Sequence, residues 1–204
     1  MSSTLDKIKQ DPALPQLIEE INDFWAKEQT KRKAYYEIVH EDVKAEFING
    51  EIIYQSPVKS KHWKACTRIS ARLSIYVDEK KLGIVGAEKV MIRCTRNDYE
   101  PDVVFFSNEK AKDFQPNQMV FPPCDLAVEV LSESTKKNDY GVKFEDYAAH
   151  GIIEYWIVDA DEESVEQYLL KDQAYHLHQK LTKSGVLKST VVEGFEMEIG
   201  IIFS

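Results

Sequence analysis

The fold is decided by two short apolar segments, PDVVFF at residues 101–106 and DLAVEVL at residues 125–131. Both segments are rich in Val, Leu and Phe and are bounded by polar or proline-containing sequence, which predicts interior β-strands. Within each apolar run there is one acid, Asp102 or Glu129, where a buried strand normally has none; Asp125 stands just before the second run. Because an isolated buried carboxylate is costly, a cation, a hydrogen-bond network or a raised pKa must compensate it. The two acids therefore predict a metal site, an acid/base pair or pairing with a cation in the core.

The rest of the chain predicts an α/β (α+β) domain with a mixed sheet and helices packed on it. Residues 138–150 predict a helix that ends at Gly151, with Tyr140, Phe144 and Tyr147 facing inward. Helices are also predicted for residues 1–40 and 60–77, a hairpin for 45–55 around Asn49-Gly50, and strands for 83–92, 99–107, 125–131, 154–159, 165–170, 174–178 and 191–203.

Length and composition predict one domain with an appendage. At 204 residues and 43% hydrophobic, the chain can bury a sizeable core. We expect an N-terminal helical extension over residues 1–30 and a domain over residues 31–204. No apolar run approaches the roughly 20 residues of a membrane span, and the first residues lack a signal-peptide pattern. We therefore expect a cytoplasmic protein with no membrane segment.

Cysteine and histidine usage is modest. Cys66, Cys94 and Cys124 are far apart and contain no CxxC pair, which fits a reducing compartment and argues against disulfides and against a cysteine zinc site. His176 and His178 form a His-x-His pair that alternation places on one face of a strand. No zinc motif accompanies them, so a solvated strand face is the simpler interpretation and a metal site the alternative.

The charge balance bears on nucleic acid as a partner. A net charge of −9 is unusual for a general nucleic-acid binder, although a local basic surface and divalent ions can overcome it. The predicted helix at 60–77 has an apolar face that includes His62. Its basic row is either a solvated face or a contact surface for the DNA backbone; the row consists of Lys61, Lys64, Arg68 and Arg72.

The two strand acids can converge on one cation. If their strands are neighbours, Asp102 and Glu129 meet, and the backbone carbonyl of Val130 adds an oxygen ligand. Mg²⁺ or Mn²⁺ is the natural occupant of an oxygen-only site. Lys143 lies four residues after Asp139 on one helix face and can reach back over the strand end, as in metal-assisted phosphodiester hydrolysis. The alternative is structural: Asp102 caps a turn, Glu129 pairs with a core cation, and Lys143 bridges Asp139 on the surface.

The order of motifs resembles that of the Uma-two family of endonucleases. The resemblance rests on EVLSEST at 129–135, on EYWIVD at 154–159, and on Asp139, Lys143, Tyr147 and Gly151 between them. It extends upstream to Pro101-Asp102, to His62 and to AEFINGE at 45–51, and it covers residues 30 to 203. That family has the restriction-endonuclease-like fold and PD-(D/E)XK active sites.

The resemblance implies roles for individual residues. Asp102 would be the aspartate of the PD motif, Glu129 the second acid, and Glu46 an additional acid near the metal. The standard motif has lysine two positions after the second acid, where this chain has Leu131, so Lys143 would substitute for it in space. His62 is either a hydrogen-bonded core residue or a residue at the rim of the site.

The expectation is thus a restriction-endonuclease-like mixed central sheet with extra C-terminal β-hairpins and a Mg²⁺- or Mn²⁺-dependent nuclease site acting on DNA. Such enzymes commonly act as homodimers, because two sites can address two strands. The rival is a nuclease-like fold that no longer cuts and binds nucleic acid or protein.

Overall fold

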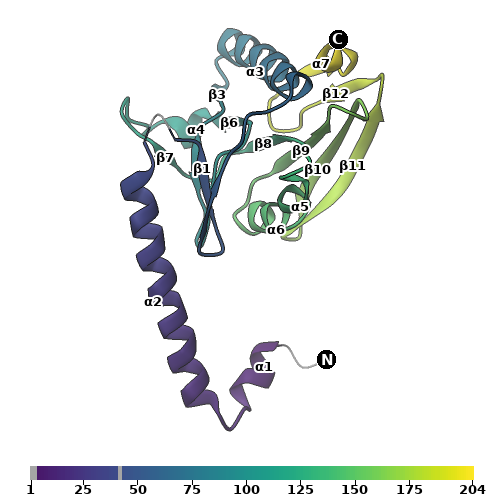
Figure 1. The fold of residues 1–204 in the computed structure, drawn as a ribbon. Coiled ribbons are helices and arrows are strands. Elements are labelled where there is room, and N and C mark those ends of the chain that lie inside the picture. Colours follow the sequence, from purple (N-terminus) through teal and green to yellow (C-terminus); the bar gives the residue numbers. More distant parts are fainter. Residues whose placement is uncertain (1–3, 41–42) are drawn as a thin grey trace.

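The computed structural model describes residues 4–40 and 43–204 and is built around a six-stranded mixed sheet (Figure 1). The strand order is β11-β10-β9-β8-β6-β3, and only the β8–β9 pair is parallel. The mixed sheet predicted from the sequence is confirmed. Its strands are β3 (Gly83–Ala87), β6 (Val103–Ser107), β8 (Leu126–Val130), β9 (Glu154–Asp159), β10 (Ser164–Lys171) and β11 (Ala174–Thr182).

The two apolar segments form the centre of this sheet. β6 and β8 are antiparallel neighbours, with Val103 opposite Val128, and all five residues of β8 are buried. Their continuous apolar sequence follows from burial on both faces, because helices cover the sheet on each side. The neighbouring strands required for the two acids to meet are therefore present.

Helix α3 (Ser60–Lys80) covers one face of the sheet. Its apolar stripe, including Ile69, Leu73 and Val77, is fully buried against alternate residues of β6, β8 and β9. The opposite face receives α6 (Val142–Ala149), whose Tyr147 packs among Val104, Ala127 and Tyr155. Figure 1 shows α3 and α6 on opposite sides of the strands. α3 and α6 correspond to the helices predicted at 60–77 and 138–150.

The helix predicted at 138–150 is two helices, α5 (Lys136–Asp139) and α6, separated at Tyr140 and Gly141. A Cβ at Gly141 would lie 2.7 Å from the carbonyl oxygen of Lys137, so this close approach requires glycine. The inward placement predicted for Tyr140 is wrong. Its side chain is exposed and donates to Glu166, because the break rotates it out of the stripe that buries Tyr147 and half-buries Phe144.

The hairpin predicted around Asn49-Gly50 is confirmed, but it belongs to a second sheet. Both turn residues have positive φ, as the turn requires. The first strand of the hairpin pairs with the segment at 98–99, where Phe47 lies opposite Asp98, and not with the central sheet. This sheet has the order β2-β1-β5-β4-β7 and consists of β1 (Ala45–Ile48), β2 (Glu51–Tyr54), β4 (Met91–Arg93), β5 (Asp98–Tyr99) and β7 (Val120–Phe121), with α4 (Asn108–Ala111) preceding β7.

The C-terminal region differs in part from its prediction. The predicted β10–β11 hairpin forms, but it extends the central sheet and continues to Thr182. The tail holds one short ladder, β12 (Val186–Lys188) with β13 (Glu196–Glu198). It ends as a helix, α7 (Gly200–Phe203), where strand was predicted. α7 packs against α3, and Arg68 donates to the carbonyl oxygen of Ile202.

The N-terminal region forms two helices, α1 (Thr4–Lys9) and α2 (Leu14–Ile38), so the predicted helix over 1–40 is interrupted at 10–13. Residues 1–3 of that prediction lie outside the described residues. α2 projects from the body (Figure 1) and is anchored by its last turns. Arg96 donates two 2.7 Å hydrogen bonds to Glu28, and Arg32 donates to both oxygens of Asp98. In residues 4–40 and 43–204, no helix has the length and apolar character needed to cross a membrane.

Candidate active site

The sheet places the two strand acids at one edge. Asp102 directly precedes β6, and Glu129 is the fourth residue of β8. Since Val103 lies opposite Val128, one further step along the antiparallel pair brings Asp102 opposite Glu129. The backbone N–H of Val130 donates to Asp102 Oδ2 at 2.8 Å and fixes that carboxylate. Sequence and register thus bring Asp102, Glu129 and Val130 together.

Lys143 of α6 lies among three carboxylates. Its Nζ is 2.8 Å from Glu46 Oε1, 3.0 Å from Glu129 Oε1 and 3.5 Å from Asp139 Oδ1. The predicted reach of Lys143 over the strand end is therefore observed. The bridge to Asp139 forms, but its predicted surface location is wrong, because Lys143 is only 1% exposed. Glu129 does pair with a core cation, as the structural alternative stated. Leu131, which occupies the position of the standard lysine, is half-buried at the cavity wall.

The charges of this cluster do not balance within the protein. Burial alone would lower the pKa of Lys143, but the surrounding carboxylates outweigh it and raise that pKa well above its usual value. Burial raises the pKa of Glu129, and it raises the pKa of Asp139 to about 6. Lys143 is thus a stable cation, and the raised pKa values of Glu129 and Asp139 indicate that its single charge does not compensate all three neighbouring acids. Tyr147 adds a 2.7 Å hydrogen bond to Glu129 Oε1.

Asp102 has a separate set of basic neighbours. His62 Nε2 lies 3.3 Å from Asp102 Oδ1, and Lys44 Nζ lies 3.7 Å from the same oxygen. Burial alone would raise the pKa of Asp102, but the hydrogen bond and charge of His62, the charge of Lys44 and the Val130 N–H lower it below its usual value. Asp102 is therefore a carboxylate, ready to bind a cation.

Several buried oxygens in the cluster lack a hydrogen-bond partner. They are Glu100 Oε2 and both carboxylate oxygens of Asp139. Burial and the charge of Glu46 raise the pKa of Glu100 to about 7. By contrast, the fully buried Glu154 accepts hydrogen bonds from six donor atoms and is a structural carboxylate. Carboxylate oxygens that lack hydrogen-bond partners are ligands of the kind that a hard divalent cation such as Mg²⁺ or Mn²⁺ prefers.

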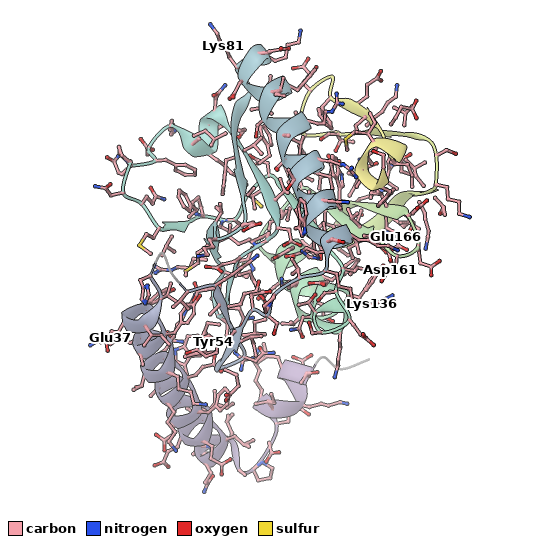
Figure 2. All side chains as sticks on the ribbon, turned by 45° about the horizontal axis from the view of Figure 1, so that its top comes forward. Glu37, Tyr54, Lys81, Lys136, Asp161 and Glu166 are labelled. Carbon is pink, nitrogen blue, oxygen red and sulfur yellow. The ribbon has the colours of Figure 1, made fainter. Side chains whose placement is uncertain are left out.

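The cluster opens into a cavity of about 630 Å³. Asp102, Glu129 and Lys143 form its floor, and segments 55–59 and 132–135 form its sides. Asp161, labelled in Figure 2, lies beside the N-terminal end of α3, where it is 3.3 Å from Lys61. The acids that could hold a cation are thus accessible to a ligand from solvent.

The residues of the predicted basic row lie in different places in the structure. Lys61 lines the cavity, and Lys64 is exposed on the same helix. Arg68, a residue of α3, is half-buried against α7, and Arg72 lines a separate groove beside Tyr76. Only the first part of the row therefore adjoins the candidate site.

His62 combines both of its predicted interpretations, because it is hydrogen-bonded and also lines the cavity. His176 and His178 are both exposed on β11, as expected for a solvated strand face. The three cysteines are buried and free, and Tyr155 and Trp156 of β9 are fully buried.

Four neighbours of the site were not predicted from the sequence. They are Lys44, Cys66, Glu100 and Tyr147, of which Tyr147 was predicted only as an inward-facing residue. Glu100 and Asp102 alternate along the chain before β6, a pattern that could have indicated two acids near one strand end. Nothing in the local sequence of Lys44 distinguishes it from other surface lysines.

Comparisons with known proteins concern both the sequence and the fold. A family model described as "Uma2: Putative restriction endonuclease" matches residues 32–200. The fold is similar to a crystal structure described as a putative nuclease belonging to DUF820 from Anabaena variabilis. The TM-score is 0.69 and the identity 15%, with 83% of this chain and 94% of that chain covered. No match is found among curated proteins. The predicted restriction-endonuclease-like α/β fold is confirmed.

Proposed function

Because this chain belongs to the Uma2 family of restriction-endonuclease-like nucleases, we propose that it is an endonuclease that hydrolyses DNA phosphodiester bonds with Mg²⁺ or Mn²⁺. The observation that carries this proposal is the charge imbalance around Lys143. One buried ammonium faces Glu46, Glu129 and Asp139, beside the ionised Asp102, at the floor of an open cavity.

The residues that would hold the cation are Asp102 and Glu129, with the backbone carbonyl of Val130 as a further oxygen donor. Their oxygen-only chemistry suits a hard cation. Bound there, such a cation would stabilise negative charge on a phosphate and lower the pKa of water. Val130 also orients Asp102, because its N–H holds Oδ2 and leaves Oδ1 for other contacts.

Lys143 acts as a fixed positive charge in this proposal. Because the surrounding acids raise its pKa, it remains protonated and does not abstract a proton from water. It positions Glu129 through their 3.0 Å contact and stabilises charge that develops on the phosphate. Glu46 is a positioning residue, since it holds Lys143 at 2.8 Å and accepts the N–H of Glu100.

In this proposal the DNA backbone binds at the mouth of the cavity and along the adjoining turns of α3. Lys61 lines the mouth, Lys64 follows it on the exposed face, and Lys44 lies at its inner wall. Arg68 and Arg72 extend the row away from the cavity and would contact only a longer duplex. Three buried free cysteines fit a reducing compartment, so we place the protein in the cytoplasm.

Cleavage of plasmid DNA with Mg²⁺ or Mn²⁺ tests the proposal. We expect Asp102→Asn, Glu129→Gln and Lys143→Met each to lower the cleavage rate by about 100-fold or more. The matched control is Glu145→Gln, because Glu145 is an exposed acid on α6 two residues after Lys143. Equal residual nicking by all variants would identify a contaminating nuclease and contradict the proposal.

One observation favours a second candidate function. Leu131 stands where the standard motif has lysine, which is compatible with a nuclease-like fold that binds nucleic acid or protein without cutting. Calorimetric titration with Mn²⁺ separates the two. DNA binding without any heat of Mn²⁺ binding at millimolar metal would favour the binding module.

We place the homodimer interface on the projecting half of α2. Ile18, Ile21 and Phe24 are each at least half exposed and continue the stripe that buries Glu28 and Arg32 against the body. The N-terminal half of the helix carries acids and the C-terminal half carries lysines. An antiparallel pair of these helices therefore brings opposite charges together; the residues are Glu19, Glu20 and Asp23 in one half and Lys27, Lys31 and Lys33 in the other.

Sedimentation analysis tests this interface. We expect a dimer for the wild type and a monomer for Ile21→Asp with Phe24→Asp. The control is Ile75→Asp, since Ile75 is an exposed apolar residue on α3. A wild type that is monomeric at all concentrations, or a dimer that survives the double substitution, would contradict it.

A further inference from the structure

A mixed set of donor atoms lies beside the cavity, which His62 and Asp102 line, while the neighbouring Cys66 is buried. His62 and Cys66 are four residues apart on α3 and therefore share one helix face, which is turned toward Asp102. One ligand atom from each of His62, Cys66 and Asp102 lies within 4.8 Å of the other two. The cysteine was not expected in a metal site, because its sequence contains no pairing motif and only the tertiary fold brings Asp102 to it.

The chemistry of this set differs from that of the oxygen-only site. An imidazole nitrogen, a thiolate sulfur and a carboxylate oxygen are the donors typical of Zn²⁺, and three protein ligands leave the fourth position for solvent. Mg²⁺ avoids sulfur. The three residues therefore select a softer cation than Glu129 and Val130 would.

The donor atoms are available to an incoming ion. His62 Nδ1 is buried without a hydrogen-bond partner, so binding of an ion at this nitrogen would break no hydrogen bond within the protein. Asp102 Oδ2 is held by Val130, whereas Oδ1 faces His62. His62 and Asp102 line the cavity, which gives a path from solvent. Lys44, the nearest competing cation, lies 3.7 Å from Oδ1 with a partly exposed side chain that can turn outward.

We propose that His62, Cys66 and Asp102 form a binding site for Zn²⁺ or a chemically similar ion. Binding converts the Cys66 thiol to a thiolate, and its proton is released to solvent. Because Asp102 also belongs to the hard-cation site, zinc inhibits DNA cleavage by withdrawing that carboxylate. The inhibition rests on the proposed function, whereas the binding does not.

Absorption spectroscopy with Co²⁺ tests the binding directly, since a thiolate ligand gives an intense sulfur-to-cobalt band in the near ultraviolet. We expect this band for the wild type, saturating at about one equivalent of Co²⁺ and displaced by Zn²⁺. Cys66→Ser should abolish the band. Cys94→Ser and Cys124→Ser are matched controls, because both cysteines are also buried and free, and both variants should keep it.

A second variant guards against misfolding of the Cys66 variant. His62→Gln keeps the thiol and should weaken Co²⁺ binding by about tenfold or more, with an unchanged circular dichroism spectrum. The proposal is overturned if the wild type shows no sulfur-to-cobalt band, or if the band persists in Cys66→Ser.

Zinc titration of the Mg²⁺-supported cleavage reaction tests the inhibition. Zinc should inhibit the wild type at concentrations about tenfold or more below those that inhibit Cys66→Ser. Equal inhibition of both proteins would overturn the shared role of Asp102. A protein that never cleaves DNA but shows the cobalt band would refute the nuclease and support the zinc site.

Discussion

At the residue scale, the buried carboxylates fall into two kinds. Glu154 is saturated by donors from β9, β10 and the segment 189–191, so it contributes to folding. Asp139 and Glu100 keep buried oxygens without a hydrogen-bond partner. An unsatisfied buried carboxylate costs free energy that the rest of the fold must offset, and such groups cluster where a ligand is bound.

The saturation of Glu154 gives a first prediction. Glu154→Gln replaces an acceptor oxygen by an amide that faces hydrogen-bond donors, and it removes a charge that these donors stabilise. We expect the free energy of unfolding to fall by about 2–4 kcal/mol, measured by urea denaturation. Glu163→Gln, at an exposed turn residue, should change it by less than about 0.5 kcal/mol. A loss this small in Glu154→Gln would show that the network is not required.

At the residue scale, the sequence predicts which buried acids cost free energy, but it does not predict which neighbouring side chains compensate that cost. The acids Asp102 and Glu129 were recognisable because they interrupt apolar strands. Glu46, Lys143 and His62 reach them from three different elements, and the family motif order, not local periodicity, indicated the first of these. Lys44, Cys66 and Glu100 were missed because their role exists only after the strands and α3 are packed.

At the element scale, the break between α5 and α6 positions the lysine. Asp139 ends α5 and Lys143 lies in the first turn of α6, so Lys143 contacts both Asp139 and Glu129 from one short connection. A continuous helix was predicted because the apolar spacing runs through 140 and 141. The contact of Gly141 with Lys137, which breaks the helix, has no signature in the apolar pattern.

This break gives a second prediction. Gly141→Ala places a Cβ 2.7 Å from the carbonyl oxygen of Lys137, so α6 must shift and carry Lys143 with it. We expect a loss of about 1–3 kcal/mol in the free energy of unfolding, together with weaker Mn²⁺ binding in calorimetry. The control is Gly200→Ala, where the new Cβ meets only Lys183 at 3.8 Å. Equal effects of both substitutions would contradict the role of the break.

The anchor of α2 gives a third prediction, which concerns pH. The hydrogen bonds from Arg96 lower the pKa of Glu28 below its usual value. A carboxyl group with a lowered pKa stabilises the folded state above its unfolded pKa of about 4.5, and this contribution is lost as the pH falls through the folded value. We expect Glu28→Gln to cost about 1 kcal/mol at pH 7 and almost nothing near pH 3, by thermal denaturation. A cost independent of pH would contradict this account.

At the scale of the whole molecule, the acidic charge shapes how DNA can approach. The chain carries a net charge of −9, and the cavity floor adds to the repulsion of phosphates. Among the described residues, the lysines that line the cavity besides Lys143 are Lys44, Lys59 and Lys61. A divalent cation at the floor would therefore have to reverse the local potential before a phosphate can enter.

The acidic floor of the cavity gives a fourth prediction. At constant ionic strength, Ca²⁺ should strengthen binding of the wild type to a short DNA duplex by about tenfold or more, measured by fluorescence anisotropy. Asp102→Asn with Glu129→Gln removes two negative charges, so this variant should bind DNA without Ca²⁺ and respond little to it. Wild-type binding that is unaffected by Ca²⁺ would contradict the prediction.

The architecture of the molecule was predictable only in part. Alternation and apolar runs predicted the central strands, α3 and the hairpin at 45–55. The second sheet was not predicted, because β4, β5 and β7 are only two or three residues long and carry little periodic signal. The ordering of strands also depends on contacts between segments far apart in the chain, which local patterns do not report.

The one-ended anchoring of α2 has a consequence for how this sequence can diverge. Within the described part of α2 the buried residues are Glu28, Arg32 and Tyr35, and the family model begins at residue 32, inside this anchor. Substitutions in the preceding turns therefore carry little folding cost, whatever they do to association. The first half of α2 can therefore change in sequence, and in the surface that it presents for association, without loss of the folded body.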